Sequence, residues 1–421
     1  MKSLKKMYTT LLKDDFPQDL TLDLGGRKLV YKKRVWTLDG EVKGLRYGEN
    51  PDQPAALYEL VDGSLEFGGV KLRRPGQGVV SAIGEAQMLQ AGKHPGKTNL
   101  TDVDSGVNIL QSLTARPAAV ILKHNNPCGA AWADGIGQAL DKAFWCDRIA
   151  AFGGAVVLNR TLDKLCADII DSAYFEVVAA PDFEEGTLDT LKKRKNLRIF
   201  KLPALADLSG LAQSPYLEIK SLADGGLIVQ QSFMNRIRAV EDFIPASAEK
   251  DGQTYTARTP TPDEASDLLF AWAVESGVIS NSVIFAKNGA TVAIGAGEQD
   301  RVGCVELAVY KAYTKYADRL CFRENNLSLY ELRLKAAQDP QAEAKLKDIE
   351  KRTQEAKGGL KDAVMVSDGF FPFRDGVDAA TCHGVKAIAQ PGGSLRDHEV
   401  IQAVNESSTA MVFTGQRAFK H

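Results

Sequence analysis

The chain has 421 residues, more than one ordinary hydrophobic core accommodates, so two domains are expected. Apolar residues make up 44% of it and charged residues 25%, as in soluble globular proteins. Its 52 lysines and arginines are balanced by 54 aspartates and glutamates. This balance argues against a general nucleic-acid or membrane-surface binder, because both need a basic excess, but it permits a local basic pocket for one phosphate.

Cysteine and histidine usage indicates a reducing compartment. The cysteines are scattered without a C-x-x-C pair, and the five histidines show no metal-ligand spacing. The first residues lack an apolar core long enough for a signal peptide, and no apolar run approaches membrane-spanning length. The sequence therefore predicts a cytoplasmic protein without a membrane partner.

Residues 1–45 are expected to form an N-terminal segment. It contains a predicted hairpin, in which residues 20–24 and 28–31 are strands joined by Gly25 and Gly26. The polar, turn-rich stretch 45–53 follows. Taken alone, this stretch is more typical of a surface loop than of a binding site.

From about residue 80 to 200 the pattern becomes α/β, as apolar strands alternate with helical spacing. The run 118–122 predicts a buried parallel strand, and Pro127 and Gly129 are expected to force a turn beyond it. A helix is expected at 136–143, followed by strands at 155–158 and 175–180. Glu176 lies inside the last of these, where a buried carboxylate needs a partner or a ligand.

The stretch 203–217 is the best candidate for a domain boundary, and the second half repeats the same order of elements. Residues 261–264 form a capping box that starts a helix, and the strand 283–286 leads into a hairpin turn at Asn288 and Gly289. Residues 331–357 predict solvated helices broken at Asp339–Pro340. The last strand is expected at 410–413.

Lys123 and His124 are the sharpest local signal for chemistry, because they follow a buried strand. A histidine can take a proton and a lysine can neutralise developing charge. Adjacent strand residues point to opposite faces, but a turn at the strand end can bring both side chains to one pocket. The alternative is a surface lysine beside a hydrogen-bonded core histidine.

Two further stretches leave alternatives open. The three phenylalanines in residues 370–373 fit either core packing or an aromatic wall for a planar ring. Arg417 and His421 lie at the C-terminus, where chains usually fray, although they follow a core strand closely.

Together these stretches resemble the transformylase domain of the AICAR transformylase/IMP cyclohydrolase family of purine biosynthesis. The matching motifs occur in the family order, and the ordered set is far more specific than any one of them. They are RYGENP (46–51), KHNNPCG (123–129), AFGG (151–154), SNS (280–282), AKNG (286–289), GAG (295–297), FFPFRD (370–375), QPGGS (390–394) and RAFKH (417–421).

The resemblance implies an α/β fold with two cytidine-deaminase-like, three-layer subdomains that arose by duplication and hold no zinc. The zinc-deaminase signature is missing, because Pro127 and Cys128 are followed by Gly-Ala-Ala. The first subdomain is expected at 46–210 and the second at 211–421. The preceding cyclohydrolase domain is expected to be absent, so the protein would be monofunctional. An obligate homodimer with active sites between its subunits is also implied.

The implied activity transfers a formyl group from the co-substrate 10-formyltetrahydrofolate to the 5-amino group of AICAR, giving FAICAR late in IMP biosynthesis. This amine is conjugated with the ring, so it must lose a proton as it attacks. By the resemblance, His124 is the base, and Lys123 and Asn281 stabilise the oxyanion. No metal is implied. The residues implied for AICAR are Arg46, Tyr47, Phe152, Gly153, Glu176, Arg417 and His421, and those for the folate are Arg301, Phe370, Phe371, Pro372 and Phe373.

The sequence departs from the family pattern at Asp52, Ile279, Glu298 and Asp300. The last two make the turn before Arg301 more acidic, beside the place expected for an anionic folate. Two alternatives therefore stand beside the leading hypothesis. One is AICAR formylation with formate and ATP, and the other is a non-catalytic regulatory protein that binds AICAR or a purine nucleotide.

Overall fold

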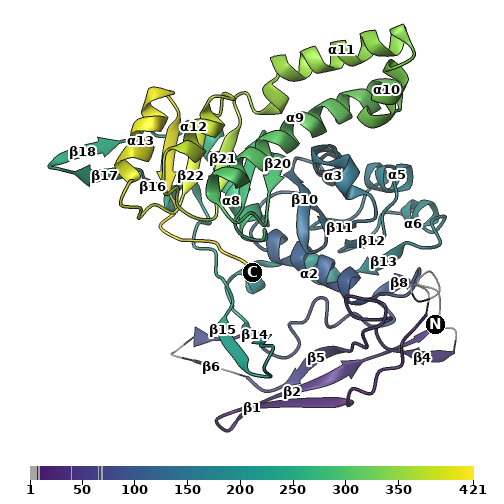
Figure 1. Ribbon diagram of the computed structural model, residues 1–421. Coiled ribbons are helices and arrows are strands. Elements are labelled where there is room, and N and C mark those ends of the chain that lie inside the picture. Colours follow the sequence, from purple (N-terminus) through teal and green to yellow (C-terminus); the bar gives the residue numbers. More distant parts are fainter. Residues whose placement is uncertain (1–6, 8–9, 39, 65, 68–69) are drawn as a thin grey trace. The chain divides into compact units, whose positions relative to one another are not determined.

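The computed structural model describes residues 7, 10–38, 40–64, 66–67 and 70–421, which form two compact units (Figure 1). Unit 1 comprises Met1–Asn125, Asp134–Gly137 and Phe152–Met234. Unit 2 comprises Asn126–Ala133, Gln138–Ala151 and Asn235–His421. The expected subdomain boundaries at residues 45 and 210 stay a prediction.

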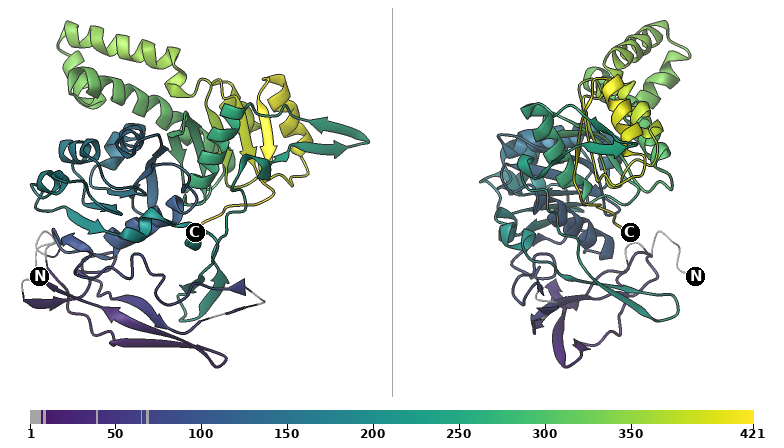
Figure 2. Two further views of the ribbon diagram at one scale, coloured as in Figure 1. Left: turned by 180° about the vertical axis from the view of Figure 1, so that it is seen from behind. Right: turned by 90° about the vertical axis from the view of Figure 1, so that its left-hand side faces the viewer.

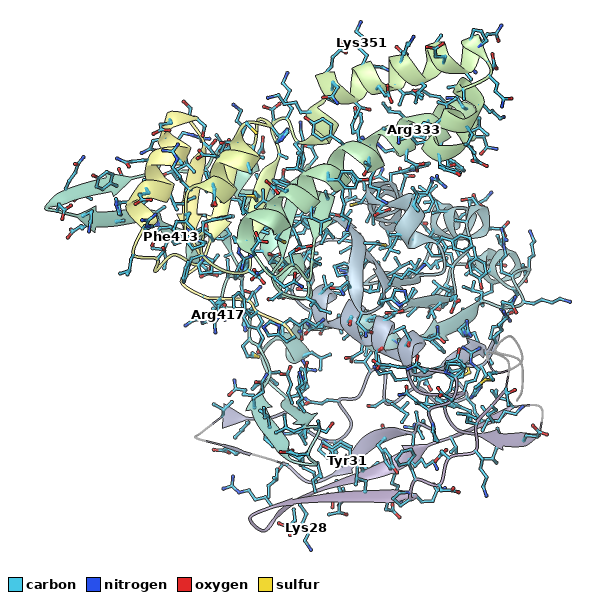
Figure 3. The ribbon with its side chains drawn as sticks, in the orientation of Figure 1. Lys28, Tyr31, Arg333, Lys351, Phe413 and Arg417 are labelled. Carbon is cyan, nitrogen blue, oxygen red and sulfur yellow. The ribbon has the colours of Figure 1, made fainter. Side chains whose placement is uncertain are left out.

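Unit 1 begins with a small antiparallel sheet whose strand order is β1-β2-β5. The predicted hairpin is confirmed, because β1 pairs antiparallel with β2 and both glycines of its turn have positive φ. Buried Leu29 and Leu72 form the core beneath this sheet, and Tyr31 packs against them (Figure 3). The bounds in this part are β1 Asp19–Leu24, β2 Arg27–Arg34, β3 Trp36–Leu38, β4 Glu41–Lys43, β5 Leu57–Asp62, β6 Glu66–Phe67, β7 Val70–Lys71, β14 Leu217–Ser221 and β15 Leu227–Gln231.

The main sheet of unit 1 has the strand order β9-β11-β12-β13-β8. β11, β12 and β13 run parallel, whereas β9 and β8 pair antiparallel at the two sides of this group. The bounds are β8 Met88–Gln90, β9 Ala118–Lys123, β11 Ala155–Leu158, β12 Val177–Ala180 and β13 Arg198–Lys201. The helices and turns are α2 Lys97–Leu110, α5 Lys164–Ser172, α6 Thr187–Leu191, η1 Pro203–Ala206 and α7 Ser209–Ala212.

Two expectations for the region around β9 are wrong. β9 is buried as predicted, but it pairs antiparallel with β11. An unbroken apolar run reports that both faces of a strand are covered, and it carries no information on strand direction. The turn after β9 is made by His124 and Asn125, which have φ of 54° and 63°, whereas Pro127 and Gly129 lie within the next strand.

Unit 2 is built around a sheet with the strand order β10-β20-β19-β21-β22-β23-β16. β21, β22 and β23 run parallel, and β19 and β16 pair antiparallel at the two sides of this group. The predicted hairpin at Asn288–Gly289 is confirmed as the β19–β20 turn. The bounds are β10 Asn126–Trp132, β16 Ile244–Pro245, β19 Val283–Lys287, β20 Ala290–Gly295, β21 Val364–Ser367, β22 Ala387–Gln390 and β23 Ala410–Phe413.

The helices of unit 2 include a long α9 on which the hairpin of α10 and α11 packs (Figures 1 and 2). The predicted break at Asp339–Pro340 is confirmed, because Asp339 caps α11 and Pro340 is its first residue. The short hairpin of β17 and β18 packs against α13. The bounds are α3 Ile136–Cys146, α4 Arg148–Ala151, η2 Val240–Asp242, β17 Ser247–Lys250, β18 Gln253–Thr256, α8 Pro262–Glu275, α9 Arg301–Asn325, α10 Leu329–Ala336, α11 Pro340–Glu355, η3 Lys357–Gly359, α12 Asp375–Thr381 and α13 Asp397–Glu406.

The two main sheets share one order of elements. In unit 1, α2 lies between β8 and β9 in the sequence, α5 between β11 and β12, and α6 between β12 and β13. In unit 2, α8, α12 and α13 hold the corresponding places between β16 and β19, β21 and β22, and β22 and β23. The pairing directions also correspond, from β9-β11-β12-β13-β8 to β19-β21-β22-β23-β16. Among the described elements of unit 1, none corresponds to the α10–α11 hairpin.

Candidate functional site

A pocket of about 260 Å³ in unit 1 gathers many of the residues that the sequence singled out. It lies where β9 ends and α2 begins, and the loop before β11 and the residues before β12 complete it. Its lining therefore comes from five separate places in the chain between Arg46 and Glu176. The residues are Arg46, Tyr47, Glu49, Gly96, Thr98, Asn99, Asp102, Lys123, His124, Phe152, Gly153, Tyr174 and Glu176.

Lys123 and His124 both line this pocket, although they are adjacent in the sequence. The positive φ of His124 ends the strand's alternation of faces, which allows neighbouring side chains to share one pocket. The Lys123 ammonium donates a hydrogen bond to the carbonyl of Phe152 and lies 6.0 Å from the centre of that ring. This hydrogen bond holds the Lys123 side chain against the loop that precedes β11.

Asp102 is a site residue that sequence reasoning missed. It lies on α2, is only 6% exposed, and accepts a 2.7 Å hydrogen bond from the backbone N–H of Asn125, directly after His124. Burial raises the pKa of its carboxyl group to about 6, although this hydrogen bond and the nearby His124 act in the opposite direction. The signal in the sequence was an aspartate on the apolar face of a helix, between Leu100 and Val103.

Glu176 was expected inside a buried strand, but it precedes β12 and is only partly buried, and it has two polar partners. The guanidinium of Arg198 lies 3.4 Å from it, and the amide of Asn99 donates a 3.2 Å hydrogen bond. Arg198 is fully buried, and burial together with the neighbouring Arg46 lowers its pKa to about 10. Neither Asn99 nor Arg198 was expected at the site, because their distance from Glu176 in the sequence gives no hint of contact.

Arg46 gives the pocket a positive end. Its guanidinium donates to the Tyr47 hydroxyl at 2.9 Å and to the carbonyl of Lys93 at 2.9 Å. Among the described residues, no atom accepts a hydrogen bond from its buried Nε. Burial lowers the Arg46 pKa, and Glu176 partly offsets this effect. A buried arginine with an unused donor is suited to an anionic ligand group.

Unit 2 contains a second cluster, around Asn281. The Arg301 guanidinium donates to the Asn281 amide oxygen at 2.8 Å and forms an ion pair with the fully buried Asp368. Asp368 also accepts a hydrogen bond from the Ser280 hydroxyl. Since the oxygen of Asn281 is engaged, its NH2 group is the part that remains to donate to a ligand.

Of the phenylalanines in residues 370–373, one packs in the core and two are available to form an aromatic wall. Phe371 is completely buried in the core of unit 2, whereas Phe370 and Phe373 are 44% and 50% exposed. The Arg396 guanidinium lies 4.9 Å from the centre of the Phe373 ring. Pro372 lies between the two environments and is partly buried.

The C-terminal residues pack against the Asn281 cluster. The backbone N–H of Ala418 donates to the carbonyl of Asp368 at 3.0 Å, and the backbone N–H of Ser280 donates to the carbonyl of Lys420 at 3.0 Å. Arg417, marked in Figure 3, is exposed and lies 4.3 Å from the centre of the Phe419 ring. His421 is exposed on the other side of Phe419 in the sequence. The terminus is therefore anchored, while its arginine and histidine remain accessible.

The acidic departure at Asp300 has a local structural role. Its side chain caps α9 by accepting a 2.6 Å hydrogen bond from the backbone N–H of Gly303. Glu298 contributes its backbone carbonyl, which accepts from the Asn281 N–H at 3.1 Å. A helix cap accounts for the aspartate without reference to the ligand.

No group of three or more histidine, cysteine, aspartate or glutamate side chains could hold a metal ion within the described ranges. Cys128 is a thiol whose pKa is raised by burial, so it is a poor metal ligand in this state. None of the helices that the structure describes is both long and apolar enough to cross a bilayer.

Comparison with known proteins gives one family. The model of the AICARFT/IMPCHase bienzyme family matches residues 16–311. The bifunctional purine biosynthesis protein PurH of Magnetococcus marinus is 35% identical over 401 residues, which cover 95% of this chain and 63% of that protein. The corresponding values are 37% over 386 residues for Nostoc sp. (91% and 61%) and 38% over 382 residues for Persephonella marina (90% and 59%). The chain thus spans about three fifths of the length of these relatives.

Proposed function

Since the chain belongs to the AICARFT/IMPCHase bienzyme family, we propose that it transfers a formyl group from 10-formyltetrahydrofolate to the 5-amino group of AICAR, giving FAICAR and tetrahydrofolate. The observation that carries this proposal is the pocket in unit 1, where a strand-end Lys123–His124 pair lies with Arg46 and Glu176. These groups offer a base, a fixed positive charge and an anion site to one small molecule.

His124 is proposed as the base that removes the proton from the AICAR amine. The amine is a weak nucleophile because its lone pair is delocalised into the ring, so nitrogen attack and proton loss must be concerted. The buried Asp102 carboxylate holds the backbone beside His124 and stabilises the cationic ring that forms when the proton arrives. We assign Asp102 as a positioning residue.

Lys123 and Asn281 are proposed to stabilise the oxygen anion that develops when the formyl carbon is attacked. An ammonium and an amide NH2 both donate hydrogen bonds to negative oxygen, and fixed donors lower the barrier most when they need no rearrangement. Arg301 fixes the amide by engaging its oxygen. We propose that Lys123 also protonates the departing folate nitrogen.

Substrate binding follows from the remaining groups. Arg46, Tyr47 and Arg417 are proposed to bind the nucleotide phosphate, and Phe152, Gly153, Glu176 and His421 to line the nucleotide pocket. The exposed rings of Phe370 and Phe373 are proposed to contact the folate, with Pro372 between them. Because Arg301 is committed to Asp368, we assign it to positioning Asn281 rather than to binding a folate carboxylate.

We also propose that the two main sheets are duplicated, cytidine-deaminase-like subdomains that work without zinc. Their shared order of strands, helices and pairing directions supports this assignment. The fold would then supply a rigid strand-end platform, and the chemistry would come from side chains in place of a metal.

The decisive experiment supplies purified protein with AICAR and either 10-formyltetrahydrofolate or formate plus ATP. FAICAR formation with the folate alone is expected, and its absence would refute the proposal. His124→Ala is expected to abolish turnover while AICAR binding stays measurable by calorimetry. His398→Ala, on α13, is the matched control and should remain active. Near-normal turnover of His124→Ala would remove His124 as the base.

A homodimer whose active sites combine residues of both subunits is proposed as the working form. Mixing inactive His124→Ala and Asn281→Ala proteins under conditions that exchange subunits tests this directly. Mixed dimers would then hold one intact site each, so about a quarter of wild-type activity should return, since half of randomly paired dimers are mixed. Recovery of no activity, or an active monomer in sedimentation, would contradict shared sites.

A further inference from the structure

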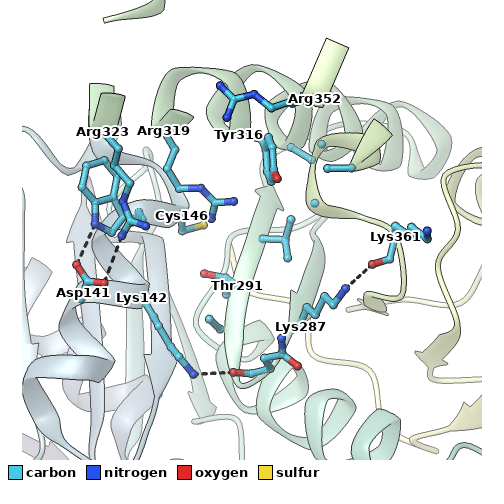
Figure 4. A pocket seen from close by; sticks show the side chains of 18 of the residues that line it. Asp141, Lys142, Cys146, Lys287, Thr291, Tyr316, Arg319, Arg323, Arg352 and Lys361 are labelled. Atoms are coloured by element: carbon cyan, nitrogen blue, oxygen red, sulfur yellow. Dashed lines mark hydrogen bonds and ion pairs between the residues drawn. The ribbon is translucent and has the colours of Figure 1, made fainter. Parts of the chain in front are cut away.

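Unit 2 contains a larger pocket, of about 830 Å³, which none of the residues assigned to formyl transfer lines (Figure 4). It is bounded by α3, the β19–β20 hairpin, α9, the end of α11 and the glycine turn that follows. Its volume lies within the range of pockets that bind small molecules.

The lining carries more positive than negative side chains. Its basic residues are Lys142, Lys287, Arg319, Arg323, Arg352 and Lys361, and its acidic residues are Asp141 and Glu355. Two of the arginines are already neutralised: Arg323 pairs with Asp141 at 3.4 Å, and Arg352 pairs with Glu324 at 2.7 Å. Lys287 also lies 3.9 Å from the Asp362 carboxylate, which offsets part of its charge. The positive charge that remains is therefore greatest on Arg319, Lys142 and Lys361.

Arg319 is the central group of this pocket. Its guanidinium points toward the cavity beside Cys146 and lies 4.6 Å from the centre of the Tyr316 ring (Figure 4). Within the described part of the chain, it forms no ion pair and no hydrogen bond. Burial raises the pKa of the Cys146 thiol to about 11, so this neighbour is neutral and does not offset the guanidinium.

The lysines face the same space from the opposite side. The Lys142 ammonium donates to the carbonyl of Asn288 at 2.9 Å, and the Lys287 ammonium donates to the carbonyl of Lys361 at 2.7 Å (Figure 4). Each of these contacts uses one of three ammonium protons. The remaining donors are available to an anion that bridges the lysines and Arg319.

An apolar wall adjoins these charges. Gly359 has φ of 87°, and a Cβ there would lie 3.3 Å from the Tyr316 ring and 3.4 Å from Val292. The glycine thus keeps the ring and the neighbouring wall open. Tyr316 is partly buried, and a tyrosine ring beside a guanidinium at a pocket wall is suited to stacking with a planar heterocycle.

We propose that this pocket binds a nucleotide, with its phosphate held by Arg319, Lys142 and Lys287 and its base against Tyr316. Arginine forms paired hydrogen bonds with phosphate oxygens, and lysine adds point charge. The nucleotide would bind here without reacting, and none of the residues that hold it takes part in the proposed formyl transfer. If the chain acts in purine biosynthesis as proposed, a purine nucleotide could bind here and signal its own concentration without occupying the pocket at Lys123.

The test is titration calorimetry with AMP as the probe. Wild-type protein should bind AMP, and Arg319→Met should weaken this binding at least tenfold, as should Lys142→Met. The matched control is Arg333→Met, which should leave binding unchanged. Arg333 lies on α10, outside the pocket, and is labelled in Figure 3. Binding should also weaken as salt is raised, because exposed charges are screened.

Two arms separate this pocket from the one in unit 1. Arg46→Met should leave the Arg319-dependent binding of AMP in place, whereas AMP binding that depends on Arg46 alone would overturn the proposal. Adenosine should bind at least tenfold more weakly than AMP, and equal binding would refute the role of the charges. Absence of AMP binding at millimolar concentration would also overturn the proposal. Each outcome is read from binding alone, so it does not depend on formyl transfer.

Discussion

Replacing Asp102 by asparagine should make the protein more stable at neutral pH while lowering its turnover. The carboxyl group is buried, and its pKa is raised from the ordinary 3.8 to about 6. Its charged form is therefore disfavoured in the folded state. Asparagine keeps an oxygen that can accept the Asn125 N–H, so the substitution removes mainly the charge.

The magnitude follows from proton linkage. Each tenfold change in proton affinity is worth about 1.4 kcal/mol, so raising this pKa from 3.8 to about 6 costs about 3 kcal/mol once the group is ionised. Between pH 4 and pH 6 the folded protein retains a proton that the unfolded chain has lost. Raising the pH through this window therefore destabilises the wild type, and Asp102→Asn escapes this loss.

The assay is urea denaturation of both proteins at several pH values between 4 and 8. The stability of Asp102→Asn relative to wild type should rise by about 3 kcal/mol across this range and level off above pH 6. Asp168→Asn, which removes an exposed aspartate on α5, is the control and should show no such trend. A stability difference that stays flat with pH would refute the account of Asp102. Unchanged turnover in Asp102→Asn would refute its positioning role.

Other substitutions test the packing that supports both clusters. Arg198→Met should lower the free energy of unfolding by about 1–2 kcal/mol, because it removes a buried donor from the partly exposed Glu176 carboxylate and from the carbonyl of Lys93, and an unchanged free energy in urea denaturation would contradict this. Gly129→Ala should cost about 3 kcal/mol or more, or prevent folding, because its Cβ would lie 2.0 Å from the Ala143 carbonyl oxygen; normal expression and thermal stability would disprove the clash. Thr261→Ala should cost about 1 kcal/mol by removing the N-cap of α8, whereas Thr261→Ser should retain most of the stability measured by thermal denaturation.

Local signals in the sequence determined much of the secondary structure. The hairpin at Gly25–Gly26, the tight turn at Asn288–Gly289 and the break at Asp339–Pro340 were predicted correctly. Each depends on the backbone preferences of a few adjacent residues, which a linear sequence displays directly. The α/β character followed in the same way from the alternation of apolar strands and amphipathic helices.

Strand direction and the turn after β9 were decided by tertiary structure. β9 is as apolar as a parallel strand because its faces are covered, yet it pairs antiparallel with β11. Pro127 and Gly129 are usual turn residues, but the turn was taken by His124 and Asn125. Which elements cover the two faces of β9, and which strand pairs with it, depend on segments distant in the chain. Neither could be inferred from local composition.

The same division holds for the candidate site. The sequence identified Lys123, His124 and Arg46 through the order of their motifs, and the fold places them in one pocket. Only the fold shows that Asp102 lies behind the loop at His124 and that Arg198 neutralises Glu176. The sequence thus named the candidate catalytic groups, because motifs are local. Tertiary structure decided their charges and partners, because burial and pairing arise only when distant segments pack together.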